Sequence, residues 1–154
     1  MNYRTTIFAF VMVVGFAATP NLAHAQPATQ SDEVRIVVNG LRNQKGSVIC
    51  SLWSEADSGN FTKTDTETKK VSAPIQDSQG VCEFKSLQAG AYAVTVFHDE
   101  NGDGKFNRRF LFPLEGYGFT NNVNPQIKAP GFDECKFQYS GKGVLTETIK
   151  IIYR

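Results

Sequence analysis

Short runs in which apolar residues occupy every second position constrain the fold of this chain more than any other feature of its sequence. Residues 34–38 and 48–52 each place three apolar side chains at alternate positions. Successive side chains of a β-strand point to opposite faces, so both runs are predicted strands with one face in a core. Residues 91–98 (AYAVTVFH) are apolar on both faces, which predicts a central strand covered on both sides. With turn residues between the runs and no convincing amphipathic helix, the sequence predicts an all-β fold, a single antiparallel β-sandwich of about seven strands.

The first 25 residues have the three parts of a cleavable signal peptide. Arg4 gives a short amino-terminal region its positive charge, residues 7–18 (IFAFVMVVGFAA) are apolar throughout, and residues 23–25 (AHA) form a small-x-small cleavage signal. The apolar run is shorter than the roughly 20 residues that a transmembrane helix needs, and no later stretch approaches that length. We therefore expect a periplasmic or secreted protein that is not inserted in a membrane after the signal is cleaved.

The predicted organisation is a signal peptide (residues 1–25), a flexible polar lead-in (26–33) and one β-sandwich domain (34–154). Removal of the signal takes away one basic residue, Arg4, and no acidic one, which changes the formal charge from +1 to zero. No cluster or stripe of Lys and Arg remains, so the charge pattern argues against nucleic acid or an anionic membrane as the main partner. The expected partner is an extracytoplasmic ligand, either protein or carbohydrate.

The chain has three cysteines, and in an exported protein two of them can form a disulfide. Cys50 shares the inner face of its run with Leu52, and Cys82 alternates with Phe84, so both sulfur atoms are expected to point into the core. Cys135 begins a further alternating run, also points inward, and is an alternative partner. No CxxC motif and no cluster of Cys and His is present, so the sequence supports neither a zinc site nor a dithiol redox site.

Residues 99–104 (DENGDG) begin like a calcium-binding loop, because oxygen-bearing side chains occupy alternate positions and glycine occupies the sixth. The twelfth position holds Phe110 in place of the glutamate of an EF-hand, so the bidentate ligand is missing and Ca²⁺ should bind weakly. The alternative is a hairpin in which Asn and Asp side chains bond to their own backbone. The candidate metal ligands are the side chains of Asp99, Asn101, Asp103 and Asn107 and the main-chain carbonyl of Lys105.

Catalysis has little support in the sequence. His98 is the only histidine of the mature chain, because His24 leaves with the signal. A catalytic triad needs a nucleophile held beside such a histidine, and no GxSxG turn is present. We therefore expect a non-catalytic binding or structural module. The alternative is a small extracytoplasmic hydrolase in which His98, Asp99 and Glu115 act together, with the two carboxylates doing acid–base work.

Residues 115–122 (EGYGFTNN) combine aromatic rings with amides, a composition that suits recognition of a ligand on a loop. The alternative is that Tyr117 and Phe119 close the end of the sandwich as part of its core. By contrast, Tyr92 follows a turn near the start of a strand, which predicts a structural hydroxyl bonded to backbone at a corner. The candidate ligand-binding residues are His98, Glu115, Tyr117, Phe119, Asn121 and Asn122.

The segment 90–105 (GAYAVTVFHDENGDGK) resembles an uncharacterised bacterial family of secreted proteins, domain of unknown function 2141. Further matches are Pro113, residues 115–119 (EGYGF) with the amides that follow, and residues 130–132 (PGF). The resemblance covers nearly all of the mature domain. It implies a transthyretin-like or immunoglobulin-like sandwich and brings no established activity.

The same resemblance bears on the cysteines and on the loop. Many relatives carry cysteine at the places of Cys50 and Cys82, and a small apolar residue at the place of Cys135. It therefore favours a disulfide between Cys50 and Cys82. The family usually has Asp where this chain has Asn107, a departure that lowers the negative charge available to an ion in the loop.

Overall fold

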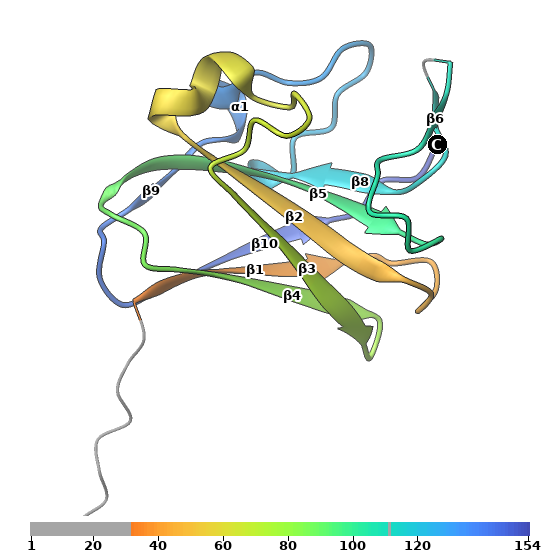
Figure 1. Ribbon diagram of the computed structural model, residues 1–154, viewed down its shortest axis with the longest axis horizontal. Helices are drawn as coiled ribbons and strands as arrows, with labels where there is room; N and C mark the ends of the chain where they lie inside the picture. Colours follow the sequence, from red (N-terminus) through yellow and green to blue (C-terminus); the bar gives the residue numbers. More distant parts are fainter. Residues whose placement is uncertain (1–31, 111) are drawn as a thin grey trace, which may run out of the picture.

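The protein is described by a computed structural model that covers residues 32–110 and 112–154 (Figure 1). The predicted signal peptide (1–25) and most of the lead-in (26–33) lie outside the described residues. Three short helical turns are η1 (Glu55–Asn60), η2 (Thr120–Asn122) and α1 (Phe132–Cys135). The strands are β1 (Glu33–Asn39), β2 (Ser47–Ser54), β3 (Lys69–Gln76), β4 (Gln79–Lys85), β5 (Gly90–Asp99), β6 (Arg108–Arg109), β7 (Phe112–Pro113), β8 (Tyr117–Phe119), β9 (Phe137–Tyr139) and β10 (Val144–Lys150).

Two layers of strands form the sandwich that the sequence predicted. The strand order is β10-β1-β4-β3-β2-β5-β8, and β9 also pairs with β5. In Figure 1 β10, β1 and β4 form the lower layer, β2, β5 and β8 the upper one, and β3 connects them. A bridge between Tyr117 and Ile152 brings the segment after β10 back to β8, so the sheet nearly closes on itself. The pairs are antiparallel as predicted, except that β1 and β10 are parallel.

The core between the layers contains the side chains that the alternating pattern assigned to it. The alternate apolar residues of β1 and β2 have no exposed surface. A disulfide joins Cys50 of β2 to Cys82 of β4 and so links the two layers, while Cys135 is buried and free. The predicted pairing is confirmed. The placement of Cys135 on a strand is wrong, because this residue ends α1 and β9 begins only after it.

Strand β5 is central, as predicted, since it pairs with β2, β8 and β9; its inner face is buried, and its outer face is half-buried at Thr95 and Phe97. At its start the Tyr92 hydroxyl donates a hydrogen bond of 2.9 Å to the carbonyl oxygen of Gln88, which confirms the predicted corner. One face of β5 lies in the core. The other face is the outer surface of the upper layer, where the site is built.

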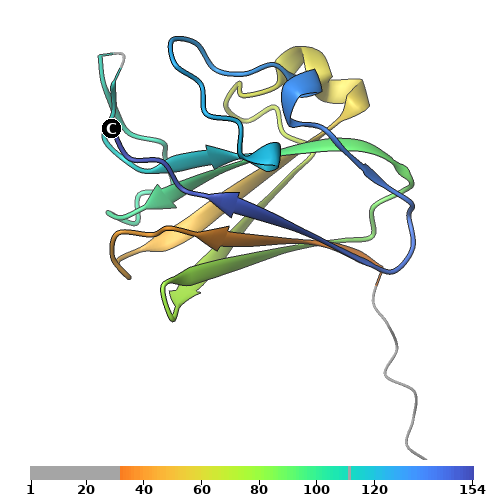
Figure 2. The same cartoon turned by 180° about the vertical axis from the view of Figure 1, so that it is seen from behind.

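A second, smaller apolar cluster covers one end of this outer face. It contains Trp53 of β2, Phe61 after η1, Phe119 of β8 and Phe132 of α1, whose rings meet edge to face in two places. Figure 2 shows η1 and α1 side by side above the sheet at this end. In the part of the chain that the structure describes, no helix covers the rest of this outer face. Among the described residues, no helix is long and apolar enough to cross a membrane.

Candidate functional site

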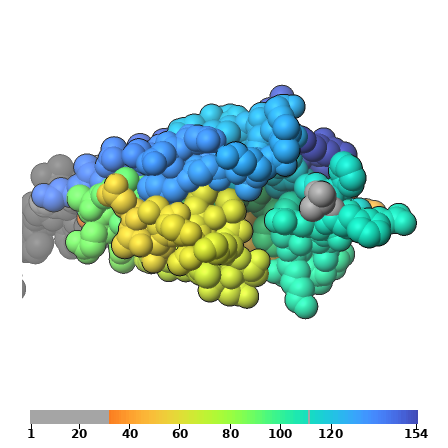
Figure 3. Space-filling view, turned by 90° about the horizontal axis from the view of Figure 1, so that it is seen from above, coloured from red at the N-terminus to blue at the C-terminus, as the bar shows by residue number. Residues whose placement is uncertain are grey.

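An open groove of about 820 Å³ lies on the uncovered part of the outer face, shown from above in Figure 3. Strand register sets its floor. Ser51 pairs with Thr95 and Thr95 with Phe119, while Phe97 pairs with Tyr117, so side chains of β2, β5 and β8 share one face. The residues of the floor are Ser51, Trp53, Thr95, Phe97, Tyr117 and Phe119. They offer apolar rings at the sides and hydroxyl groups between them.

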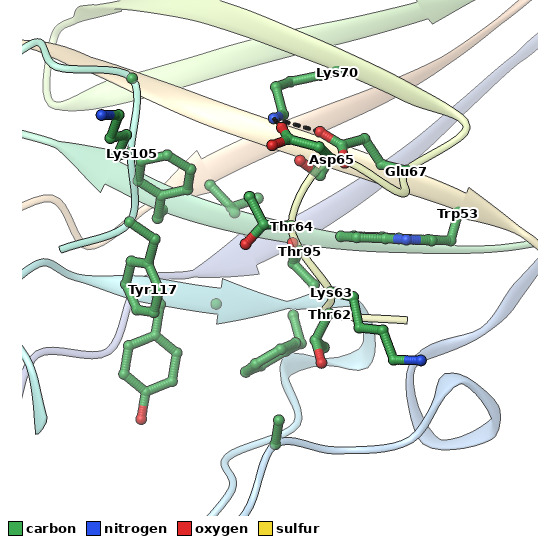
Figure 4. Close-up of a pocket in the computed structure, with 18 of the residues that line it drawn as sticks. Trp53, Thr62, Lys63, Thr64, Asp65, Glu67, Lys70, Thr95, Lys105 and Tyr117 are labelled. Atoms are coloured by element: carbon green, nitrogen blue, oxygen red, sulfur yellow. Dashed lines mark hydrogen bonds and ion pairs between the residues drawn. The ribbon is translucent and has the colours of Figure 1, made fainter. Parts of the chain in front are cut away.

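Two loops that are distant in sequence form the walls of the groove (Figure 4). Residues 62–67 supply hydroxyl and charged side chains on one side, and residues 103–108 close the other. Lys70 of β3 is fixed at the first wall by ion pairs with Asp65 (3.2 Å) and Glu67 (2.5 Å). The hydrogen bond to Glu67 is the main reason that the pKa of Lys70 is raised. The walls therefore carry charges of both signs, and some of these charges are already paired with one another.

Aromatic rings form a continuous row along the groove. The ring centroids of Phe97 and Phe106 are 5.6 Å apart, those of Phe106 and Tyr117 6.0 Å, and those of Tyr117 and Phe119 5.9 Å. The Arg108 guanidinium lies 4.9 Å from the centre of the Phe106 ring. Edge-to-face and cation–π contacts of this kind hold the rings in fixed orientations.

The wall at residues 103–108 belongs to the loop in which calcium ligands were predicted. Asp99, at the end of β5, is buried, and its carboxylate anchors the loop. Its Oδ1 accepts hydrogen bonds from the backbone N–H groups of Gly102 (2.9 Å) and Asp103 (3.1 Å), and its Oδ2 from that of Gly104 (2.9 Å). Gly102 and Gly104 have φ near +73°, which side chains rarely adopt, so the loop needs glycine at both positions.

Amide side chains surround the second carboxylate of the loop. Asn101 Nδ2 donates to Asp103 Oδ2 (3.0 Å), and Asn107 Nδ2 donates to the same oxygen (3.1 Å). The backbone N–H of Lys105 donates to Asp103 Oδ1 at 2.8 Å. This backbone bond, followed by the bond from Asn107, lowers the pKa of Asp103. The predicted ligands Asp99, Asn101, Asp103, Lys105 and Asn107 thus lie in one compact loop, bonded to one another.

Glu115 joins this loop from a distant position in the sequence. Its Oε2 accepts a hydrogen bond of 3.0 Å from the backbone N–H of Asn107. Its pKa is raised, first by burial and then by the negative charges of Asp99 and Asp103, although the bond from Asn107 opposes the shift. The structure therefore places Glu115 beside this loop (residues 99–107, the acidic loop) and not with the aromatic residues that were grouped with it.

The oxygen atoms of the loop are of the kind that calcium prefers, because carboxylate, amide and carbonyl oxygens are hard ligands. Within the described residues, no three side chains of His, Cys, Asp or Glu are placed to hold a metal ion together. A cation in this loop would depend on the amide and carbonyl oxygens of Asn101, Lys105 and Asn107 as well as on Asp99 and Asp103. Rotation of the two amides would exchange N–H donors for the oxygen acceptors such an ion requires.

His98 lies in the interior, at the edge of the core and away from the groove. Its Nε2 is 2.8 Å from the carbonyl oxygen of Lys45, which can only accept, so Nε2 carries the proton. Its Nδ1 lies 2.7 Å from the Tyr153 hydroxyl, within hydrogen-bond distance. The carboxylate nearest its ring is that of Glu100, at 3.7 Å. Both ring nitrogens are therefore engaged by the fold, and the carboxylates of Asp99 and Glu115 bond to loop backbone instead.

Asn121 and Asn122, also predicted to contact a ligand, tie neighbouring segments together. Asn121 Nδ2 donates to the carbonyl oxygens of Glu134 and Lys136, both at 3.1 Å. Asn122 bonds to the backbone of β10 at Thr148 and Lys150. These bonds fix η2 between α1 and β10. Of the predicted ligand-binding residues, the groove is lined by Tyr117 and Phe119, and Phe119 is also part of the second apolar cluster.

A family model described as uncharacterized protein conserved in bacteria (DUF2141) matches residues 36–146. The chain belongs to this family. The matched segment includes the acidic loop and both walls of the groove. No curated protein and no solved structure matches the chain.

In this DUF2141 domain, the sequence prediction missed most of the groove. Trp53, Phe97 and Phe106 line it, together with the wall at residues 62–67. One signal could have pointed to the floor: β2 and β5 carry apolar residues on both faces, which is more than a sandwich with one solvated face needs. The walls had no such signal, because residues 62–67 read as an ordinary polar loop.

Proposed function

We propose that this DUF2141 chain is an exported, non-catalytic binding module whose ligand lies in the outer-face groove. The observation that carries the proposal is a row of aromatic rings in an open groove of about 820 Å³, with hydroxyl groups on its floor. Ligand sites in proteins are typically clefts of about 300–1,000 Å³, lined by aromatic side chains with a few polar groups. The volume suits a few sugar rings or a short peptide.

The lining favours carbohydrate over peptide. A β-sheet can bind an extended peptide by adding it as a strand at a free sheet edge. At this groove the outer side of β8 is already bonded at Tyr117, whose N–H and carbonyl pair with Ile152. Recognition therefore depends on side chains. Aromatic faces carry negative charge density that attracts the C–H groups of a sugar ring, and Ser51, Thr95 and Thr64 can bond its hydroxyls.

In this proposal Ca²⁺ bound in the acidic loop stabilises one wall of the groove. Asp103, Gly104 and Lys105 belong both to the acidic loop and to the lining of the groove. A cation held by the loop would fix this wall and offset the repulsion among Asp99, Asp103 and Glu115. Burial is the main cause of the raised pKa of Glu115, and the negative charges of Asp99 and Asp103 add to it, so a cation in the loop would oppose this second contribution.

The engagement of His98 supports a binding role over a hydrolytic one. A general base needs a ring nitrogen within reach of a substrate or nucleophile. In this chain both nitrogens of His98 are bonded within the fold, its side chain has no exposed surface, and it does not line the groove.

Binding to a glycan array and to insoluble cell-wall polysaccharides tests the proposal, using wild type, Tyr117→Ala and Phe97→Ala. We expect binding to at least one glycan and a loss of about tenfold or more in each variant, since a buried aromatic contact contributes about 1.5–3 kcal/mol. Phe112→Ala is the matched control, because this aromatic side chain is exposed and lies outside the groove. Equal loss in the control, or release of shortened glycan products, would contradict the proposal.

A further inference from the structure

The hairpin of β6 and β7 exposes apolar side chains to an unusual degree. The exposed fractions are 91% for Phe110, 72% for Phe112 and 55% for Leu114. Figure 1 and Figure 2 both show this hairpin projecting from the end of the upper layer. Large apolar side chains that are exposed together on a soluble domain usually mark a surface that is covered by a partner.

Two arginines lie in the same hairpin as the exposed rings. Arg109 pairs with Phe112 across the hairpin, and Arg108 pairs with Pro113 one step further from the tip. Both arginines are exposed, and in the described part of the chain neither forms an ion pair with a carboxylate. The hairpin therefore carries cationic side chains next to its exposed rings, with Arg109 level with Phe112 and Arg108 one step further back.

We propose that this hairpin docks the protein onto the surface of an anionic lipid bilayer. Phe110 and Phe112 enter the boundary between headgroups and acyl chains, and Arg108 and Arg109 pair with lipid phosphates. Arg108 precedes Phe110 by two residues, which span at most about 7 Å of chain, and Arg109 lies level with Phe112. Apolar side chains of interfacial segments lie about 5–10 Å below the headgroups, so Phe110 can reach this depth while both arginines stay near the phosphates. The contact lies in the interface and requires no spanning segment.

The shape and charge of the hairpin favour lipid over a protein partner or a second copy. Protein interfaces are broad, about 800 Å² on each side, whereas this feature is a narrow projection with strands of two residues each. Its two arginines, of which Arg108 also contacts the Phe106 ring, complement lipid phosphate. The charge pattern of the whole chain gave the opposite expectation, because net neutrality hides two adjacent arginines beside a pair of phenyl rings. The inference rests on the exposure and charge of the hairpin and not on a ligand in the groove, which Arg108 also lines.

The test is co-sedimentation of the exported protein with lipid vesicles. Mass spectrometry of its amino terminus excludes binding through an uncleaved signal peptide. The vesicles are phosphatidylcholine alone and phosphatidylcholine with phosphatidylglycerol. We expect wild type to bind the anionic vesicles. The double variant Phe110→Ser with Phe112→Ser should lower this affinity about tenfold or more. The double variant Arg108→Gln with Arg109→Gln should lower it about fivefold for each arginine removed. Val81→Ser and Lys142→Gln are matched controls on other surfaces and should bind as wild type does.

A second measurement places the hairpin in the bilayer. The chain has a single tryptophan, Trp53, which is buried and should not be quenched by brominated lipids. Phe112→Trp should add fluorescence that brominated anionic vesicles quench. Failure of wild type to sediment with either vesicle, or equal loss in the controls, would overturn the proposal. A change of oligomeric state in the hairpin variants, with no vesicle binding by wild type, would assign the hairpin to self-association instead.

Discussion

Removal of the disulfide should destabilise this domain strongly, because the bond links the two layers of the sandwich. Cys50 and Cys82 are fully buried and lie 32 residues apart in sequence. In the chain-entropy model, a closed loop of this size lowers the entropy of the unfolded chain by an amount that contributes about 4 kcal/mol to stability. For a domain of this size that corresponds to a fall in Tm of roughly 12–20 °C.

The assay is urea unfolding of the double variant Cys50→Ala with Cys82→Ala, followed by the fluorescence of the buried Trp53. Alanine is chosen because serine would bury a hydroxyl with no partner. Cys135→Ala is the control, since it removes a buried sulfur but no cross-link, and it should cost only about 1 kcal/mol. A difference below about 1 kcal/mol between the double variant and this control would refute the reasoning.

Three further predictions concern the acidic loop and its supports. Ca²⁺ at ten times a dissociation constant of about 10⁻⁴–10⁻³ M should stabilise the protein by about 1.4 kcal/mol and raise Tm by about 3–8 °C; an equal rise in Asp103→Ala, or none in wild type, would leave the loop a hydrogen-bonded turn. Because burial raises the pKa of Glu115 above its ordinary 4.5, its contribution to stability is present below that pH and is lost as the pH rises through the raised pKa. Between pH 4.5 and the raised pKa, Glu115→Gln should therefore make the free energy of unfolding, measured by urea titration, less dependent on pH. An unchanged dependence would argue against a raised pKa for Glu115. Gly116→Ala should cost about 1–3 kcal/mol in the same assay, because the added Cβ would lie 2.3 Å from the Tyr153 ring, and full stability would show that the ring moves away freely.

The inner faces of the sandwich could be predicted because strand side chains alternate with a period of two. That rule placed the apolar residues of β1 and β2 in the core and turned Cys50 and Cys82 inward. The same local logic identified the Tyr92 corner, since the turn that precedes the strand lies next to it in sequence. Each of these features depends on neighbouring residues, so the sequence carries its signal.

The features that were missed depend on contacts between distant segments. Nothing near β1 indicates that β10 lies parallel to it, because the two strands are joined only through the whole intervening chain. Cys135 fits an alternating run, but Pro130 and Gly131 precede it and Phe132 packs on the outer face, which favours a short helix instead. Glu115 reaches the acidic loop only because the β6–β7 hairpin folds the chain back on itself.

The candidate site arises from the same property that made β5 recognisable as a central strand. A strand that is apolar on both faces must be covered twice, once by the opposite layer and once by something outside the sandwich. In this chain the outer cover comes from loops and short helices, and they cover only one end of β2, β5 and β8. Phe97 and Tyr117 remain partly exposed between the acidic loop and residues 62–67. The groove is therefore the part of a doubly apolar sheet that this chain leaves uncovered, and a ligand with flat apolar faces would complete the cover.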